Sequence, residues 1–120
     1  MSLDVTLSRK KWVSYDEGKT HEVEDEELFS ANITHNLGKM ADKAGIYHAC
    51  WRPEEISATR ARDILPLLEK GYADMIAQPE YYKQFDSPNG WGTYIDFLPW
   101  VKEYMNACRE FPDADISVDR

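Results

Sequence analysis

The stretch DVTLSRKKWVSYDEGKTHEV, residues 4–23, decides the fold prediction for this chain. Residues 16–19 (DEGK) predict a hairpin turn, because Gly18 supplies the positive φ that such turns need. A return strand is expected over 20–23, then an acidic stretch over 22–27 and a further short strand that ends at Ile33. The first strand of the hairpin contains a partly alternating run of β-branched, aliphatic and aromatic residues typical of strands: Val5, Leu7, Trp12, Val13 and Tyr15.

Helical patterns fill most of the chain beyond the hairpin. Thr34 suits the N-cap of a short helix that ends at Gly45, where a C′ glycine belongs, and 46–51 predicts one more helical turn. Longer amphipathic helices are expected over 59–78 and 93–111, and the alternating residues 115–118 predict a last strand.

Pro66 leaves two alternatives for the first long helix. Either Thr59 caps a helix that kinks at the proline, or Asp63 caps it and the proline lies in the first turn, where its missing N–H has no intrahelical partner to lose. The longer helix is preferred, because the apolar stripe extends back to Ala61.

Strands near the two ends of the chain, with helices between them, predict an α+β fold in a single domain, residues 1–120. We expect a small antiparallel sheet, formed by the N-terminal hairpin and the C-terminal strand, packed against about three helices. A chain of 120 residues has room for one hydrophobic core. We assign no meaning to residues 1–3.

The charge balance limits the classes of partner. The chain has 14 Lys and Arg against 22 Asp and Glu, a formal net charge of −8. A negative field repels phosphate, so nucleic-acid binding and attraction to anionic membranes are both disfavoured, and a protein partner is permitted. No apolar run approaches the roughly 20 residues that span a bilayer, and no secretory signal is recognised, so we expect a soluble, cytoplasmic protein with no membrane partner.

Neither a metal, a cofactor nor a catalytic thiol is expected. The acidic run over 22–27 lacks the ligand spacing of calcium loops and suits a charged hairpin edge. The three histidines follow no zinc spacing, and no CxxC is present. Cys50 and Cys108 are expected to be reduced and buried, and His48 and Cys50 would face different sides of a helix.

Polar side chains crowd the predicted junction between strand and helix in NITHNL, residues 32–37. Backbone N–H groups at such a junction are available to small polar ligands. The candidate binding residues are therefore Asn32, Thr34, His35 and Asn36. The alternative is structural: Thr34 or Asn32 caps the helix, while His35 and Asn36 hold neighbouring loops in place.

Two tryptophans form a second group of candidates. Asn89 and Trp91 lie in a loop with glycines, which present or bury the indole, and Trp51 is followed by Arg52, which offers a guanidinium for recognition. The structural alternative for both tryptophans is packing in the core.

These segments also carry a resemblance. The motifs NITHNL (32–37), WRPEE (51–55), ILPLLEKG (64–71) and PNGWG (88–92) together resemble a family of small phage and bacterial proteins that are generally called hypothetical proteins. The resemblance covers about residues 28–118 and implies a phage or mobile-element origin. It implies no activity and no cofactor.

Two functional hypotheses follow from these observations. The first is a non-enzymatic binding or interaction protein that uses 32–36, 89–92, Trp51 and Arg52. The alternative is a small enzyme or ligand sensor in which His35 is the acid/base and Asn32, Asn36 or Arg52 positions a polar small molecule. Convergence on one hollow that includes an accessible His35 would favour the second. A third idea, an acidic decoy of nucleic acid, requires negative charge along one elongated face.

Overall fold

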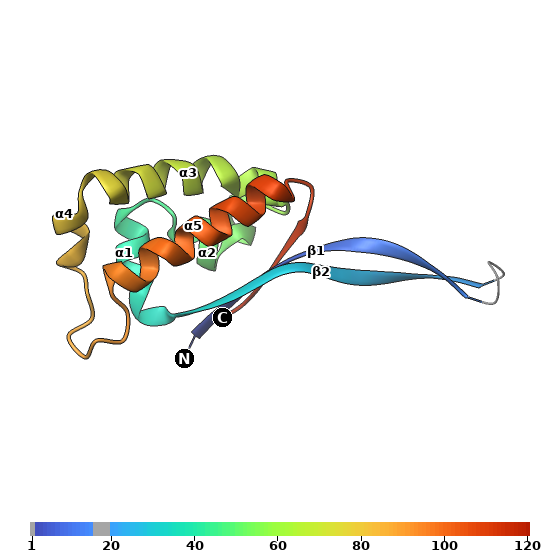
Figure 1. Ribbon diagram of the computed structural model, residues 1–120, viewed down its shortest axis with the longest axis horizontal. Coiled ribbons are helices and arrows are strands. Elements are labelled where there is room, and N and C mark those ends of the chain that lie inside the picture. The colour runs from blue at the N-terminus through green and yellow to red at the C-terminus, as the bar shows by residue number, and fades with distance from the viewer. Residues whose placement is uncertain (1, 16–19) are drawn as a thin grey trace.

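A long hairpin forms most of the sheet (Figure 1). β1 (Ser2–Tyr15) pairs antiparallel with β2 (Thr20–Thr34) on one edge and with β3 (Asp115–Asp119) on the other, which gives the strand order β2-β1-β3. The computed structural model describes residues 2–15 and 20–120, with side chains for 2–11 and 23–120. The predicted turn over 16–19 lies outside the described residues. β3 confirms the predicted C-terminal strand.

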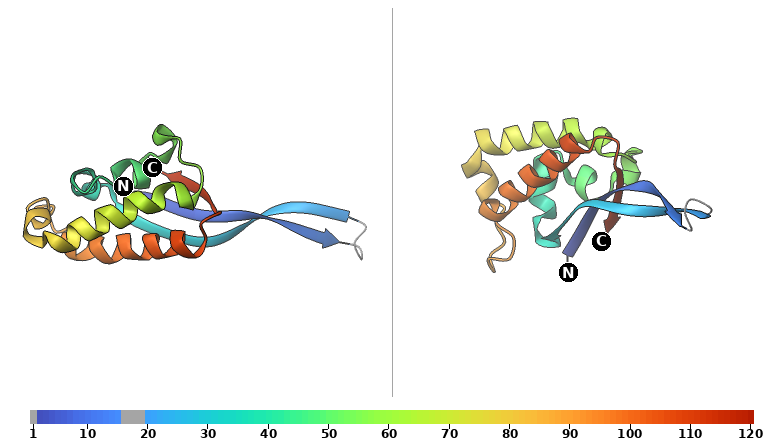
Figure 2. Two further views of the ribbon diagram at one scale, coloured as in Figure 1. Left: turned by 90° about the horizontal axis from the view of Figure 1, so that it is seen from above. Right: turned by 45° about the vertical axis from the view of Figure 1, so that its right-hand side comes forward.

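The hairpin projects well beyond the rest of the molecule. β3 pairs only with Asp4–Ser8 of β1, so the outer part of the hairpin continues as a two-stranded arm (Figures 1 and 2). The molecule measures 59 Å along this direction and 27 by 23 Å across it. A β-bulge between Leu7 and Ser8, where β2 has the additional residue Leu28, lies next to the point where the three-stranded sheet passes into the arm.

The prediction of two separate strands, over 20–23 and up to Ile33, is wrong: β2 runs unbroken through the acidic stretch. The reason lies in the opposite strand. Arg9 Nε lies 2.7 Å from Glu26 Oε2, and Lys10 Nζ lies 2.5 Å from Asp25 Oδ1. Opposite charges in facing positions stabilise antiparallel pairs, and the hydrogen bond from Arg9 lowers the pKa of the Glu26 carboxyl.

The helices pack on one face of the sheet. Leu3, Val5 and Leu7 of β1 are fully buried against them, so Leu3, to which the sequence analysis assigned no meaning, belongs to the core. The two long helices are α3 (Ala61–Ala77) and α5 (Tyr94–Glu110), as the patterns predicted. Shorter elements complete the layer: η2 (His35–Leu37), α1 (Gly38–Lys43), α2 (Tyr47–Trp51), η3 (Pro53–Ile56) and α4 (Pro79–Lys83). The architecture is α+β, as expected.

Neither predicted cap of α3 is the N-cap. Arg60 occupies that position, and the Asp63 carboxylate accepts the backbone N–H of Thr59 at 3.0 Å and of Arg60 at 2.9 Å. These two bonds lower the pKa of Asp63. The helix continues through Pro66, so the preference for the longer helix is confirmed while its cap is corrected.

Candidate functional site

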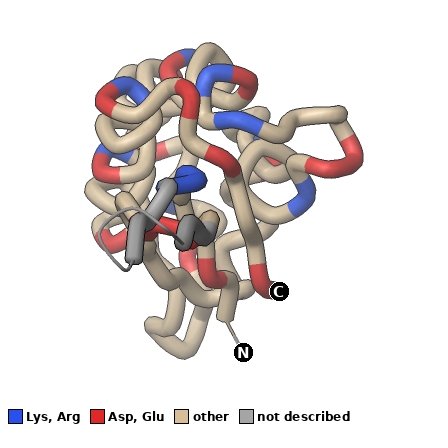
Figure 3. Tube along the Cα trace, turned by 90° about the vertical axis from the view of Figure 1, so that its right-hand side faces the viewer, with Lys and Arg blue, Asp and Glu red and all other residues tan. Residues whose placement is uncertain are grey.

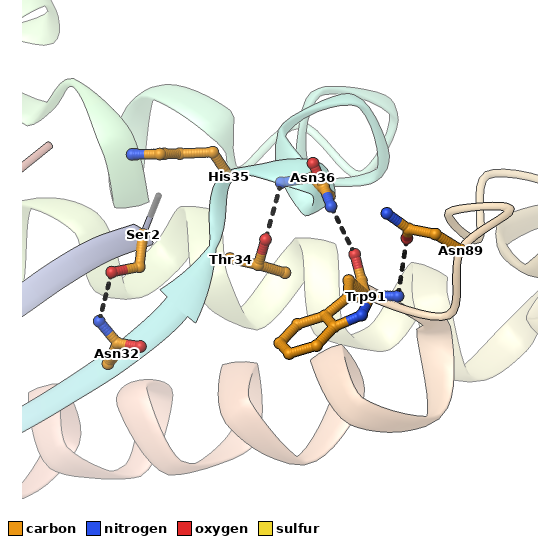
Figure 4. A pocket seen from close by; sticks show the side chains of 7 residues that line it. All are labelled: Ser2, Asn32, Thr34, His35, Asn36, Asn89 and Trp91. Carbon is orange, nitrogen blue, oxygen red and sulfur yellow. Dashed lines mark hydrogen bonds between the residues drawn. The ribbon is translucent and has the colours of Figure 1, made fainter.

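The fold brings together two segments that lie far apart in the sequence. The end of β2 with η2 meets the loop before α5, and the Asn36 side chain bridges them: its Nδ2 donates to the Trp91 carbonyl oxygen at 2.8 Å. Between the segments lies a hollow of about 500 Å³. Figure 4 shows the residues that line it: Ser2, Asn32, Thr34, His35, Asn36, Asn89 and Trp91. Six of these are candidates from the sequence.

Hydrogen bonds within the loop hold it in shape. The Asn89 Oδ1 atom accepts from Ser87 Oγ at 2.6 Å and from the backbone N–H of Trp91 at 2.9 Å. The chain then doubles back, since Ser87 N–H donates to the Gly92 carbonyl at 2.9 Å. Gly90 and Gly92 have φ of +78° and +117°, so the predicted role of glycines in turning this loop is confirmed.

The two tryptophan candidates have opposite environments. Trp91 is 72% exposed, so the core-packing alternative is wrong for it: the turn at Gly90 and Gly92 directs the indole outward. Trp51 is only 3% exposed and packs in the core, where its ring stacks on Tyr47 with centroids 5.6 Å apart. Trp51 therefore supports the hollow from the core and does not line it.

His35 is held by that buried tryptophan. Trp51 Nε1 donates to His35 Nδ1 at 2.9 Å, and this hydrogen bond is partly buried. Because Nδ1 accepts this hydrogen bond, the proton of the neutral imidazole is on Nε2. His35 thus lines the hollow with a ring that this bond orients.

Thr34 and Asn32 combine structural and lining roles. Thr34 is the predicted N-cap, and its Oγ1 accepts the backbone N–H of Asn36 at 3.2 Å. Asn32 Nδ2 donates to Ser2 Oγ at 2.9 Å and to Asp4 Oδ1 at 2.6 Å. The structural alternative is thus correct for Thr34, whereas Asn32 does not cap the helix and instead links β2 to β1. Neither role excludes contact with a ligand.

Arg52 does not line the hollow. Its Nε donates to the Tyr47 hydroxyl at 3.3 Å, and its Nη1 bonds to Glu55 at 3.0 Å. Arg52 is therefore not placed to position a small molecule beside His35 in this hollow.

Sequence reasoning missed Ser2 as a lining residue, and it expected Gly92 to turn the loop without showing how closely this glycine approaches η2. Ser2 begins β1 opposite Thr34, so the alternation of Leu3, Val5 and Leu7 was the signal that the strand starts there. Gly92 brings the loop against η2, because a Cβ there would lie 3.1 Å from Asn36 Cβ and 3.2 Å from Thr34 Cγ2. Only a side chain of hydrogen permits this approach without displacement of its neighbours.

The hollow is lined by uncharged polar and aromatic side chains, with one histidine. None of the seven lining residues is Lys, Arg, Asp or Glu, and His35 is the one imidazole among them. In the view of Figure 3, Lys and Arg are interspersed with Asp and Glu along the described part of the trace.

The cysteines and acidic residues offer no alternative site. Cys50 and Cys108 are buried and free, and burial raises the pKa of both thiols, for Cys108 to about 12. Thiols in this state are poor nucleophiles. Within the described ranges, no group of three or more His, Cys, Asp or Glu is arranged to hold a metal ion.

Comparisons with known proteins add no relative. No family model, no curated protein and no solved structure matches the chain. The resemblance to phage and bacterial proteins therefore stays a prediction. Over residues 2–15 and 20–120, no helix is long and apolar enough to cross a membrane.

Proposed function

We propose that this protein is a non-enzymatic binding protein, and that the hollow between the end of β2 and the loop before α5 receives a small, polar, uncharged ligand. The observation that carries the proposal is the exposed Trp91, whose backbone is held by Asn36 and Asn89 at a hollow that Asn32 also lines. A large exposed aromatic ring with polar groups around it is typical of recognition sites, since it offers contact area at little conformational cost.

A rigid arrangement supports binding. Asn36 and Asn89 are each held by bonds to the Trp91 backbone, and His35 by Trp51. Side chains that are already ordered lose less conformational entropy when a ligand arrives, so more of the contact energy appears as affinity.

Two observations favour the alternative of a small enzyme or ligand sensor. Asn32, His35 and Asn36 converge on one hollow, as that alternative requires, and the bond from Trp51 orients the His35 imidazole, as a general acid or base requires. Against it, no second titratable group is among the seven lining residues to complete a proton transfer. We therefore rank binding above catalysis. If the alternative holds, His35→Gln will abolish turnover of a bound ligand and leave its binding intact.

Native mass spectrometry tests the binding proposal. The full chain, the variant Trp91→Ala and the control variant Ile95→Ala are each equilibrated with fractions of a bacterial cell extract. Ile95 is a matched control because its side chain is 71% exposed, close to the 72% of Trp91. We expect a small neutral adduct on the wild type and on Ile95→Ala, and its loss from Trp91→Ala. An adduct that Trp91→Ala retains, or no adduct from any fraction, contradicts the proposal.

A further inference from the structure

We infer that the ligand of the hollow is a neutral saccharide unit that stacks on the Trp91 indole and hydrogen-bonds to the surrounding amides. This inference rests on the proposed function, and it specifies the chemical class of the ligand. It follows from the charge of the site, from the hydrogen-bonding atoms left free in it, and from the position of the exposed ring.

Charge excludes anionic ligands first. The seven lining residues include no Lys or Arg, and Asp4 lies next to the site through its bond to Asn32. The whole chain carries a formal charge of −8. A phosphate or carboxylate would meet no cation here and a repulsive field around it, which excludes an anionic ligand. A cationic ligand would find no Asp or Glu among the seven lining residues to pair with, so a neutral ligand fits the site best.

The loop side of the hollow offers mostly donors. Asn89 uses its Oδ1 for two internal bonds, which leaves both N–H groups of its Nδ2 for a ligand. Asn36 uses one Nδ2–H on the Trp91 carbonyl, which leaves a second N–H and its Oδ1. The internal bonds fix which end of each amide faces outward.

The strand side offers acceptors beside donors. Asn32 uses Nδ2 on Ser2 and Asp4, so its Oδ1 is left to accept. The Thr34 Oγ1 accepts from Asn36, and its hydroxyl hydrogen is left to donate. Figure 4 shows His35 and Ser2 on one side of the end of β2, and Asn36, Asn89 and Trp91 on the other.

Mixed donors and acceptors on both sides of a hollow match hydroxyl groups, since each hydroxyl donates once and accepts twice. The hydroxyls of a pyranose radiate around the whole ring, whereas a nucleobase presents its polar atoms along its edges. The apolar C–H face of the sugar then fits the exposed indole of Trp91. A saccharide therefore satisfies more of the free atoms than a base does.

The test is a titration of the uniformly ¹⁵N-labelled full chain with maltotriose, cellotriose and triacetylchitotriose, followed by the Trp91 indole and the asparagine side-chain amide resonances. Adenosine and N-acetylalanine methylamide serve as neutral probes that are not saccharides. We expect at least one trisaccharide to shift these resonances with a dissociation constant of about 1 mM or tighter.

Two variants connect the shifts to the hollow. Trp91→Ala removes the stacking surface, and Asn89→Asp keeps the Oδ1 acceptor while it removes both Nδ2 donors. Each should weaken saccharide binding at least tenfold. Ile95→Ala and Asn106→Asp are the matched controls: Asn106 also uses its Oδ1, on Arg109, and lies in α5 outside the hollow. Both controls should bind as the wild type does.

The outcomes separate the class of ligand from the site itself. If adenosine or the amide binds, in a manner that Trp91→Ala abolishes, and no saccharide does, the saccharide inference is overturned while the binding function stands. Saccharide binding that survives Trp91→Ala and Asn89→Asp overturns the inference, as does the absence of any shift at the hollow with all three saccharides.

Discussion

Gly92→Ala is the substitution whose effect is easiest to calculate from the structure. Gly92 has φ of +117°, a conformation that residues with a Cβ rarely adopt. Its Cβ would also lie 3.1 Å from Asn36 Cβ, 3.2 Å from Thr34 Cγ2 and 3.3 Å from Leu37 Cγ. Both effects push the loop away from η2.

The expected loss of stability has two parts. A residue forced into this backbone region costs about 1–3 kcal/mol, and the crowding adds about 1 kcal/mol, the lower end of the range for overpacking. The free energy of unfolding should therefore fall by about 2–4 kcal/mol. Gly90 separates the two parts, since it has φ of +78° and a Cβ added there would have no neighbouring atom within 4 Å. Gly90→Ala should cost only about 1 kcal/mol.

Urea denaturation followed by circular dichroism measures both variants against the wild type. The side-chain amide resonances of Asn36 report the loop directly, and they should shift in Gly92→Ala only, because the bond from Asn36 to the Trp91 carbonyl lengthens. Equal destabilisation by the two substitutions, or an unchanged Asn36 amide in Gly92→Ala, would refute the reasoning that close packing at Gly92 positions the loop.

Three further results are expected. Replacing a helical glycine with alanine usually stabilises a helix by about 1 kcal/mol. Gly71→Ala should instead lower the free energy of unfolding measured by urea titration, because its new Cβ would overlap Ile46 Cγ2. An increase in stability would contradict the packing of α3. Iodoacetamide should alkylate Cys50 and Cys108 only as fast as the chain unfolds, and rapid labelling of the native protein would contradict their burial. Burial makes the pKa of both thiols higher in the folded chain than in the unfolded chain, so above about pH 8.5 only the unfolded thiols ionise. The free energy of unfolding should therefore fall above that pH by about 1.4 kcal/mol per thiol for each pH unit, and the thiols should not change it below that pH. Urea midpoints from pH 8 to 10 measure this, and a midpoint that rises with pH would oppose it.

Local patterns predicted the elements of the fold well. The apolar stripe identified α3, the alternation over 115–118 identified β3, and Thr34 was identified as a cap. These features depend on periods and on side chains that act within a few residues. β2 was predicted in pieces, because its acidic stretch pairs with Arg9 and Lys10 of the other strand, and a single strand shows no partner.

The candidate site was predicted residue by residue and not as a whole. Nothing in the sequence shows that Asn36 and Trp91, which are 55 positions apart, share a hydrogen bond. Nor does residue type distinguish Trp51, which is buried, from Trp91, which is exposed, because an indole suits a core and a recognition surface equally. Tertiary packing decides both.

The bulge between Leu7 and Ser8 has a consequence for how changes in the length of the arm affect the strand register. Residues 2–7 pair with 29–34 on the sheet side, and 8–15 pair with 20–27 on the arm. Matched deletions or insertions in the two arm strands would preserve cross-strand pairing and leave the sheet-side register untouched, whereas a single unmatched deletion would turn the side chains beyond it to the opposite face. An arm lengthened or shortened equally in both strands should therefore leave the segment that carries Ser2 and Asn32 in register.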